Sequence, residues 1–360
     1  RWVTRGERSE LALSVDQGRA DAADLVPLPE HGWLVEGSVL MATPEAPLPT
    51  GYRAAFDPLD PPAPALSFRY CFGNVEAEDR IAFDNAPIAL PQHAVSVSDA
   101  RAVINLQTEN RSVRLRLSGI TPSGAEVSVD VPDGWQVKPD GPGLELIAPK
   151  DVVPSVYDFP LVVDGTPAHS VRRISHDHIS PTARSVPAKV TVRVLSVSVP
   201  PVRIGYVGGG NDRVAHWLSA IGADVTDLSK GGFNAEVLSK FDSIVVGIFA
   251  MKSAPGLSEN IRALHRWVRD GGTLVTLYHR PWDNWDARRT PLFPLEIGQP
   301  SLRWRVTDEK ATVTHISPDH PALNIPNKIG PETWKGWAKE RGLYFAKAWD
   351  SAYVPLLEMA

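Results

Sequence analysis

The hydrophobic pattern of the chain changes its period at about Val202, and this change predicts two different kinds of fold. Before that point apolar and polar residues alternate, as in 113–117 and 190–194, which is typical of half-buried strands in antiparallel sheets. Much of the proline, 33 residues in all, also lies before it, at 27–64 and 132–201. Because proline interrupts helices and is excluded from central strands, these stretches predict β-modules with long loops.

We expect two β-sandwich modules in this first part of the chain. The first is an all-β module at 1–94, with strands at 10–15 and around Phe68. The second is an immunoglobulin-like sandwich at 95–199. Turn signals such as Pro122-Ser123-Gly124 recur there at the spacing expected of a sandwich.

From Val202 onward, β and α elements are expected to alternate. Strands are predicted at 202–207, 223–228, 243–250 and 273–278, with a helix after each of the first three. The run 243–250 is continuously apolar, which is the pattern of a strand covered on both faces of a parallel sheet. We therefore expect an α/β flavodoxin-like domain, with a doubly wound parallel sheet, at 200–360.

Helix ends in this domain are predicted from capping residues. Asn211 is expected to cap the first helix, which has an apolar stripe beginning at Val214, and Gly222 is expected to end it. Ser258 is expected to cap the helix that buries Leu264.

Composition excludes some classes of partner. Apolar residues make up 43% of the chain, charged residues 22%, and the formal net charge is -5, so we expect no nucleic-acid partner. No apolar run reaches the length of about 18 residues that would predict a membrane span.

The single cysteine, Cys71, cannot form a disulfide within the chain and is expected to be a buried structural thiol. The first residue is Arg1 rather than methionine, so we expect a longer or processed gene product.

The loops after the parallel strands hold the candidate binding residues, because open α/β sheets bind ligands there. Gly208, Gly209, Gly210 and Asn211 follow the first strand. Their backbone N–H groups could cradle an anion, or the glycines could simply allow a tight turn into the helix. The pattern is neither a dinucleotide-binding fingerprint nor a Walker loop.

A second candidate group, His279, Arg280 and Asp283, follows the strand at 273–278. This is where we expect the nucleophile elbow of an amidotransferase-type sheet, yet 277–281 contains no cysteine or serine and no glycine. We therefore predict no catalytic residue here. The loop either binds an anionic or sugar ligand or is a solvated loop.

Two histidine groups and a set of aromatic residues are weaker candidates. If they lay in a strand, His176 and His178 would point the same way, but no third metal ligand is nearby, and 315–320 is a similarly loose group. We predict no metal site. Large aromatic residues near the C-terminus either stack on sugars or pack in a core or interface; they are Trp334, Trp337, Tyr344 and Trp349.

Several segments of the chain resemble one known protein type. The stretch 130–139, with its proline-aspartate-glycine-tryptophan run, resembles a β-sandwich module attached to carbohydrate-active enzymes, and 173–179 resembles a strand near the end of that module. Five further segments resemble class I glutamine amidotransferase-like domains; they are 203–212, 241–247, 270–275, 319–324 and 336–345. This order is similar to the C-terminal half of large bacterial PIG-L/LmbE-type deacetylase proteins, from about residue 95 to 360.

The resemblance implies a parent protein that removes N-acetyl groups from amino sugars with a zinc-activated water. It implies as partners a glycan ligand and a deacetylase domain of the same gene product. No cofactor is expected in this chain, and zinc would be bound by that deacetylase domain. The zinc motif of the family, alanine-x-histidine-proline-aspartate-aspartate, is absent, so no catalytic residue is carried over. Further strands and a helix are expected beyond Ala360.

Three functions remain open at this stage. The first is a non-catalytic accessory region that binds a glycan or packs on the deacetylase domain. The second is a purely structural spacer. The third is an independent hydrolase-like enzyme that uses His279, Arg280 and Asp283.

Overall fold

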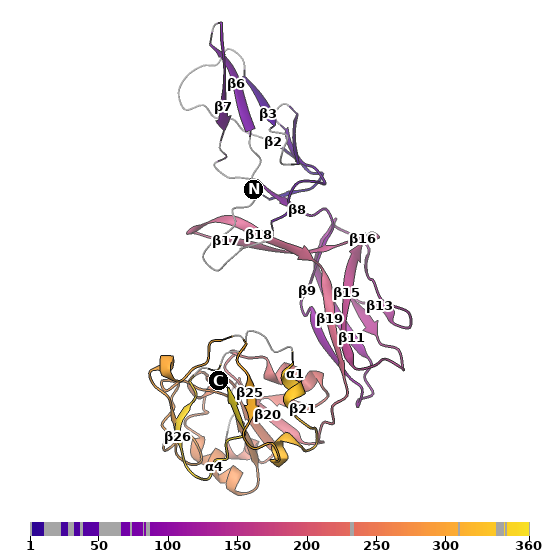
Figure 1. Cartoon of the computed structure of the whole chain (residues 1–360). Coiled ribbons are helices and arrows are strands. Elements are labelled where there is room, and N and C mark those ends of the chain that lie inside the picture. The colour runs from indigo at the N-terminus through magenta and orange to yellow at the C-terminus, as the bar shows by residue number, and fades with distance from the viewer. Residues whose placement is uncertain are drawn as a thin grey trace. The chain divides into compact units, whose positions relative to one another are not determined.

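The computed structural model of the chain consists mostly of β-strands in several sheets, with few helices (Figure 1). The structure describes residues 2–10, 23–27, 32–36, 39–49, 66–72, 74–81, 83, 87–230, 234–308, 310–335, 342 and 344–359. It divides into two compact units: unit 1 is Arg1–Val103 with Arg111–Val194, and unit 2 is Ile104–Asn110 with Leu195–Ala360. Most of the strand expected at 10–15 lies outside the described residues, as do Trp337 and the side chain of Cys71.

Two sheets of unit 1 form a β-sandwich. One sheet has the strand order β13 (Gln136–Asp140), β14 (Gly143–Ile147), β11 (Ser112–Thr121), β9 (Ala94–Val97), β17 (His169–His176), β18 (Ile179–Pro187). The other has the order β10 (Arg101–Asn105), β19 (Lys189–Leu195), β15 (Ser155–Val163), β12 (Val127–Val129), and β16 (Thr166–Pro167) pairs with β15. The alternating runs at 113–117 and 190–194 are therefore strands, as predicted.

The sandwich core is formed by inward side chains of both sheets. Phe159 of β15 is buried, and its ring centroid lies 4.7 Å from that of Trp135, which directly precedes β13 in the other sheet. Along β19, Val190, Val192 and Val194 are buried while the residues between them are more exposed. Burying a side chain of this size stabilises the fold by about 1.5–3 kcal/mol, so alternation in the sequence determines which face of each strand points inward.

Three smaller sheets complete the described part of unit 1. They are β1 (Trp2–Thr4) with β8 (Ile88–Leu90), then β2 (Arg8–Glu10), β5 (Val39–Ala42) and β4 (Trp33–Glu36), and then β3 (Ala23–Pro27), β6 (Leu66–Phe72) and β7 (Val75–Ile81). Val3, Trp33 and Leu40 are buried together in one cluster, which joins β1 to the β2-β5-β4 sheet.

Unit 2 is organised around a four-stranded parallel sheet. Its order is β21 (Asp224–Asp227), β20 (Arg203–Val207), β22 (Ser243–Val246), β23 (Thr273–Thr276). The α-helices are α1 (Val214–Ala220), α2 (Ala235–Leu238), α3 (Ala250–Ser253) and α4 (Ile261–Arg269). Ile244 and Val246 of β22 are fully buried in the same cluster as Leu264 of α4, which is the environment expected of a central parallel strand.

The helix ends predicted from the sequence agree with the structure in part. Gly222, with φ of 99°, follows α1 in the left-handed conformation that glycine favours, as predicted. Ser258 does not cap α4, whose N-cap residue is Asn260. The Ser258 hydroxyl instead donates a hydrogen bond to the main-chain oxygen of Met251, so tertiary contact overrides its local capping preference.

Two antiparallel ribbons and three short 3-10 helices follow the parallel sheet. The ribbons are β24 (Leu295–Ile297) with β26 (Ala346–Trp349) and β25 (Val313–His315) with β27 (Leu357–Met359), and the 3-10 helices are η2 (Ser301–Arg303), η3 (Pro321–Leu323) and η4 (Pro331–Trp334). No helix within the described ranges is both long and apolar enough to cross a membrane.

The first testable consequence concerns the sandwich core. Phe159→Ala removes a fully buried ring and should lower the free energy of unfolding of unit 1 by about 3–5 kcal/mol. Val156→Ala, on the exposed side of the same strand, should change it by less than about 0.5 kcal/mol. Urea unfolding, followed by hydrogen–deuterium exchange on peptides of β15, measures both; equal effects would contradict this assignment of the core.

Candidate functional site at the carboxyl ends of the parallel strands

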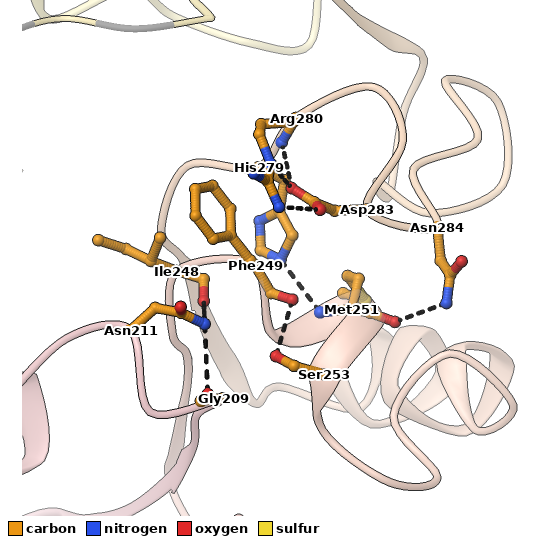
Figure 2. A network of polar contacts seen from close by, with 10 residues as sticks. All are labelled: Gly209, Asn211, Ile248, Phe249, Met251, Ser253, His279, Arg280, Asp283 and Asn284. Carbon is orange, nitrogen blue, oxygen red and sulfur yellow. Dashed lines mark hydrogen bonds and ion pairs between the residues drawn. The ribbon is translucent and has the colours of Figure 1, made fainter. Parts of the chain in front are cut away.

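The candidate residues lie on three loops at the carboxyl ends of β20, β22 and β23. Asn211, after β20, donates a hydrogen bond from Nδ2 to the main-chain oxygen of Ile248, after β22, at 3.3 Å. His279, after β23, accepts one at Nε2 from the main-chain nitrogen of Met251 at 3.2 Å (Figure 2). The segment after β22 therefore links the two groups of residues that the sequence singled out.

The Gly208-Gly209-Gly210 loop is packed closely by other parts of unit 2. The Gly208 N–H donates to Ser229 Oγ at 2.8 Å, and a Cβ atom at Gly209 would lie 1.7 Å from Ser253 Oγ. Gly210 has φ of 78°, a conformation in which glycine carries no steric penalty. These contacts favour the tight turn over the anion cradle, because the Gly208 N–H already has a partner, Gly209 has no room for a side chain, and Gly210 has a positive φ.

Asp212, rather than Asn211, orders the start of α1. Its Oδ1 accepts hydrogen bonds from the Tyr206 hydroxyl at 2.6 Å and from Val214 N at 3.0 Å, and its Oδ2 accepts one from Ile248 N at 2.8 Å. The prediction that Asn211 caps the helix is wrong, because its side chain donates to main-chain oxygens instead. Burial, assisted by Asp212, raises the pKa of Tyr206, so this hydroxyl stays neutral.

The sharp strand-to-helix turn at this edge lies at Phe249, between β22 and α3. Phe249 has φ of 58°, in the left-handed region that few non-glycine residues adopt. β22 ends at Val246 rather than continuing to Ala250 as predicted. The elbow was expected after Tyr278, but no residue at 277–281 has a positive φ. An elbow exposes the residue at its tip, and here that residue is a phenylalanine, which has no attacking group.

Arg280 and Asp283 form an ion pair beside this turn. Arg280 donates from Nε to Asp283 Oδ2 at 2.9 Å, from Nη2 to Oδ1 at 2.8 Å, and from its main-chain nitrogen to Oδ2 at 2.8 Å (Figure 2). The Asp283 side chain is fully buried. Burial alone would raise the pKa of its carboxyl, but the hydrogen bonds from Arg280 outweigh burial and lower that pKa. The carboxylate is therefore charged and neutralised within the protein.

The Arg280 guanidinium also lies on an aromatic surface. Its carbon is 3.9 Å from the centroid of the Phe249 ring and 5.6 Å from that of Trp282. Trp282 meets Tyr344 edge to face at 5.4 Å, and Phe249 meets Tyr278 likewise at 5.2 Å. We call these five residues the aromatic platform. Trp282 is 51% exposed and Tyr278 is 40% exposed, so the platform reaches solvent.

His279 is buried and both its ring nitrogens have partners. Nδ1 lies 2.8 Å from the main-chain oxygen of Leu277, and Nε2 accepts from the nitrogen of Met251. These partners assign the neutral tautomer protonated at Nδ1. Burial lowers the pKa of His279, against smaller opposing effects of the Leu277 hydrogen bond and of Asp283. A histidine held in this way has no nitrogen with which to take a proton from a ligand.

Two serine hydroxyls beside the turn are also engaged. Ser253 Oγ donates to the main-chain oxygen of Phe249 at 3.0 Å, and Ser258 Oγ donates to that of Met251. A nucleophilic serine needs a base within hydrogen-bond reach, but His279 Nε2 is occupied by the Met251 nitrogen. The observed hydrogen bonds therefore form no serine–histidine pair here.

The described residues bring no third metal-ligating side chain to either histidine group of the sequence. His176 ends β17 and His178 lies in the following turn, rather than both lying in one strand; their rings stack at 5.7 Å. His315 Nε2 accepts from Trp334 Nε1 at 2.8 Å, and His320 Nδ1 accepts from a main-chain nitrogen. No group of three or more histidine, cysteine, aspartate or glutamate side chains able to hold a metal ion occurs among the described residues.

Sequence reasoning missed Phe249 and Tyr278 as parts of this site and gave Trp282 no role beyond its place in the loop after the strand at 273–278. Tyr344 was grouped with Trp334 and Trp349, yet Trp334 contacts His315 and Trp349 lies on β26. The available signal for Phe249 was Gly247, which interrupts the apolar run. A Cβ there would lie 2.6 Å from the Tyr206 hydroxyl, so the backbone at Gly247 leaves no room for a side chain.

Comparisons with known proteins add little to this geometry. No family model and no curated protein matches the chain. Among solved structures, a chimeric titin Z1Z2 tandem matches at 13% identity and TM-score 0.21, over 55% of this chain and 95% of that one. A titin I9–I11 tandem matches at 10% and 0.24, over 57% and 67%. An endo-fucoidan hydrolase of glycoside hydrolase family 107 matches at 10% and 0.19, over 54% and 27%. At these TM-scores the likenesses support no conclusion about fold or function.

The buried state of His279 predicts a pH dependence of stability. Its pKa is lower in the folded chain than the ordinary value of about 6.5, so the unfolded chain binds the proton first as pH falls. The free energy of unfolding should therefore decrease as pH drops below about 6.5. His279→Gln should lose less stability over that range. Urea midpoints for both proteins between about pH 7.5 and about pH 5.5 test this, and an identical pH slope in the variant would contradict it.

Proposed function

We propose that unit 2 is a non-catalytic binding region that contacts a glycan at the aromatic platform, built on an α/β fold of the flavodoxin and class I glutamine amidotransferase kind. The observation that supports this most is the identity of the residue at the sharp turn between β22 and α3. Phe249 stands where an elbow would present a nucleophile, and the Arg280 guanidinium lies 3.9 Å from its ring centroid.

The groups that could perform acid–base chemistry at this edge are already used by the protein. Asp283 is neutralised by Arg280, and both nitrogens of His279 have partners. A general acid or base must be able to exchange a proton with the ligand, and neither group is arranged to do so. Binding without catalysis is therefore the simplest function compatible with these contacts.

The exposed rings supply the kind of surface that sugars contact. Flat aromatic faces bury the C–H faces of a sugar ring, and polar groups at their edge fix its orientation. Within the described part of the chain, the hydrogen bonds of Arg280 to Asp283 use Nε and Nη2, which leaves the Nη1 hydrogens available for a ligand hydroxyl. Since Asp283 neutralises Arg280, the site suits an uncharged sugar better than an anionic one.

For the protein as a whole, we propose an accessory region of a PIG-L/LmbE-type amino-sugar deacetylase. The immunoglobulin-like sandwich would space and orient unit 2, and the zinc would belong to a deacetylase domain of the same gene product. This part of the proposal rests on the resemblance of the segments between about residue 95 and 360. The full reading frame tests it, because an upstream deacetylase domain is required.

Trp282→Ala is the variant that tests glycan binding. A glycan array, followed by calorimetric titration with N-acetylglucosamine oligosaccharides, should detect binding to the wild-type chain. Trp282→Ala should weaken it roughly ten-fold, which corresponds to about 1.4 kcal/mol. Trp349→Ala is the matched control, because Trp349 is 48% exposed on β26, outside the platform.

Two results would contradict the proposal. One is the absence of binding to any saccharide together with no affinity for a deacetylase domain, which would leave a structural spacer. The other is an equal loss of affinity in the Trp282 and Trp349 variants, since that would remove the platform as the contact surface.

A further inference from the structure

A cavity lies beside the platform in unit 2 and shares Tyr278 and Tyr344 with it. It has a volume of about 330 Å³ and runs between β23 and the β24–β26 ribbon. Its apolar wall is formed mainly by the side chains of Met251, Leu274, Leu277, Leu292, Leu295 and Ile297. Tyr278, which is partly exposed, and Tyr344 also line it. A volume of this size is within the range of small-molecule sites, which is about 300–1,000 Å³.

The polar groups that line this cavity are mostly satisfied by the protein itself. Trp285 Nε1 donates to the main-chain oxygen of Leu295 at 3.0 Å, and the Tyr353 hydroxyl donates to that of Phe293 at 3.0 Å. Thr290 Oγ1 accepts from a main-chain nitrogen at 2.9 Å. A ligand inside would therefore meet few free donors or acceptors, and water would gain few hydrogen bonds there.

Among the residues that the structure describes, no carboxylate, lysine or arginine lines the cavity. Burial lowers the pKa of His279, which lines the cavity, and burial raises the pKa of Tyr278. These shifts keep both His279 and Tyr278 neutral at pH 7. Burying a charged ligand group without a partner is costly, so the lining selects against charge.

We propose that this cavity is a binding site for a small uncharged aromatic or aliphatic molecule. The apolar side chains provide burial of its body, and the Tyr278 and Tyr344 side chains contact the end that lies nearest the platform. The cavity can be tested apart from glycan binding, because Trp282 does not line it, although Tyr278 and Tyr344 of the platform do.

The matched probes 2-naphthol and 2-naphthoate test the proposal on the full chain. They share the same ring system, but 2-naphthol is uncharged at neutral pH whereas 2-naphthoate carries a carboxylate. Calorimetry should detect 2-naphthol binding with a negative heat-capacity change, and 2-naphthoate should bind roughly ten-fold more weakly or worse. Equal binding of the two probes, or no binding of 2-naphthol up to its solubility, would overturn the proposal.

Two filling variants locate the probe. Ala346→Phe and Leu292→Trp each add a ring to a residue that lines the cavity and should weaken 2-naphthol binding roughly ten-fold or more. Ala348→Phe, an exposed position on the same strand, and Trp282→Ala should leave it within about two-fold. Leu292 is only half-buried and lies outside any strand, so Leu292→Trp should disturb folding less than Ala346→Phe. It therefore provides the test if Ala346→Phe does not fold. Retained affinity in a folded filling variant, or loss in Trp282→Ala, would refute the assignment.

Discussion

The ion pair between Arg280 and Asp283 is the interaction on which the candidate site depends. A carboxylate with no solvent contact is tolerated only when its charge is compensated and its lone pairs accept hydrogen bonds. Asp283 meets this requirement with three donors from one residue. The same contacts fold the chain back after β23 and hold the guanidinium against Phe249, so the electrostatics of one carboxylate fix the position of an aromatic surface.

This arrangement explains why the edge of the sheet is a better binding surface than a catalytic centre. Catalysis needs groups whose proton or electron pair is available to a substrate. Here Arg280 and Asp283 bond to each other, and His279 bonds to main-chain groups. The exposed part of the site is largely aromatic, with Trp282 and Tyr278 open to solvent. The cavity beyond β23 follows a similar pattern, because Trp285, Thr290 and Tyr353 make their hydrogen bonds within the protein and much of the wall is apolar.

Much of the architecture was predictable because it follows from periodic burial. The alternation at 190–194 requires a half-buried strand, and β19 has that environment. The apolar run that begins at Ser243 requires a strand covered on both faces, and β22 has that environment. The site was less predictable because long-range contacts decide it. Asn211 and Ser258 are good capping residues in isolation, but other partners engage both side chains. The turn at Phe249 was missed because apolar residues continue on both sides of Gly247, which is the one local sign of a change in the backbone there.

The most direct test of this account is a double-mutant cycle on the ion pair. Arg280→Met and Asp283→Asn are made singly and together, and urea unfolding of unit 2 is followed by hydrogen–deuterium exchange at β22 and β23. Each single variant should destabilise unit 2 by about 3 kcal/mol, and the double variant by about 4 kcal/mol rather than about 6 kcal/mol, which is a coupling energy of about 2 kcal/mol. Additive effects, with a coupling energy below about 0.5 kcal/mol, would contradict the claim that this pair holds the site together.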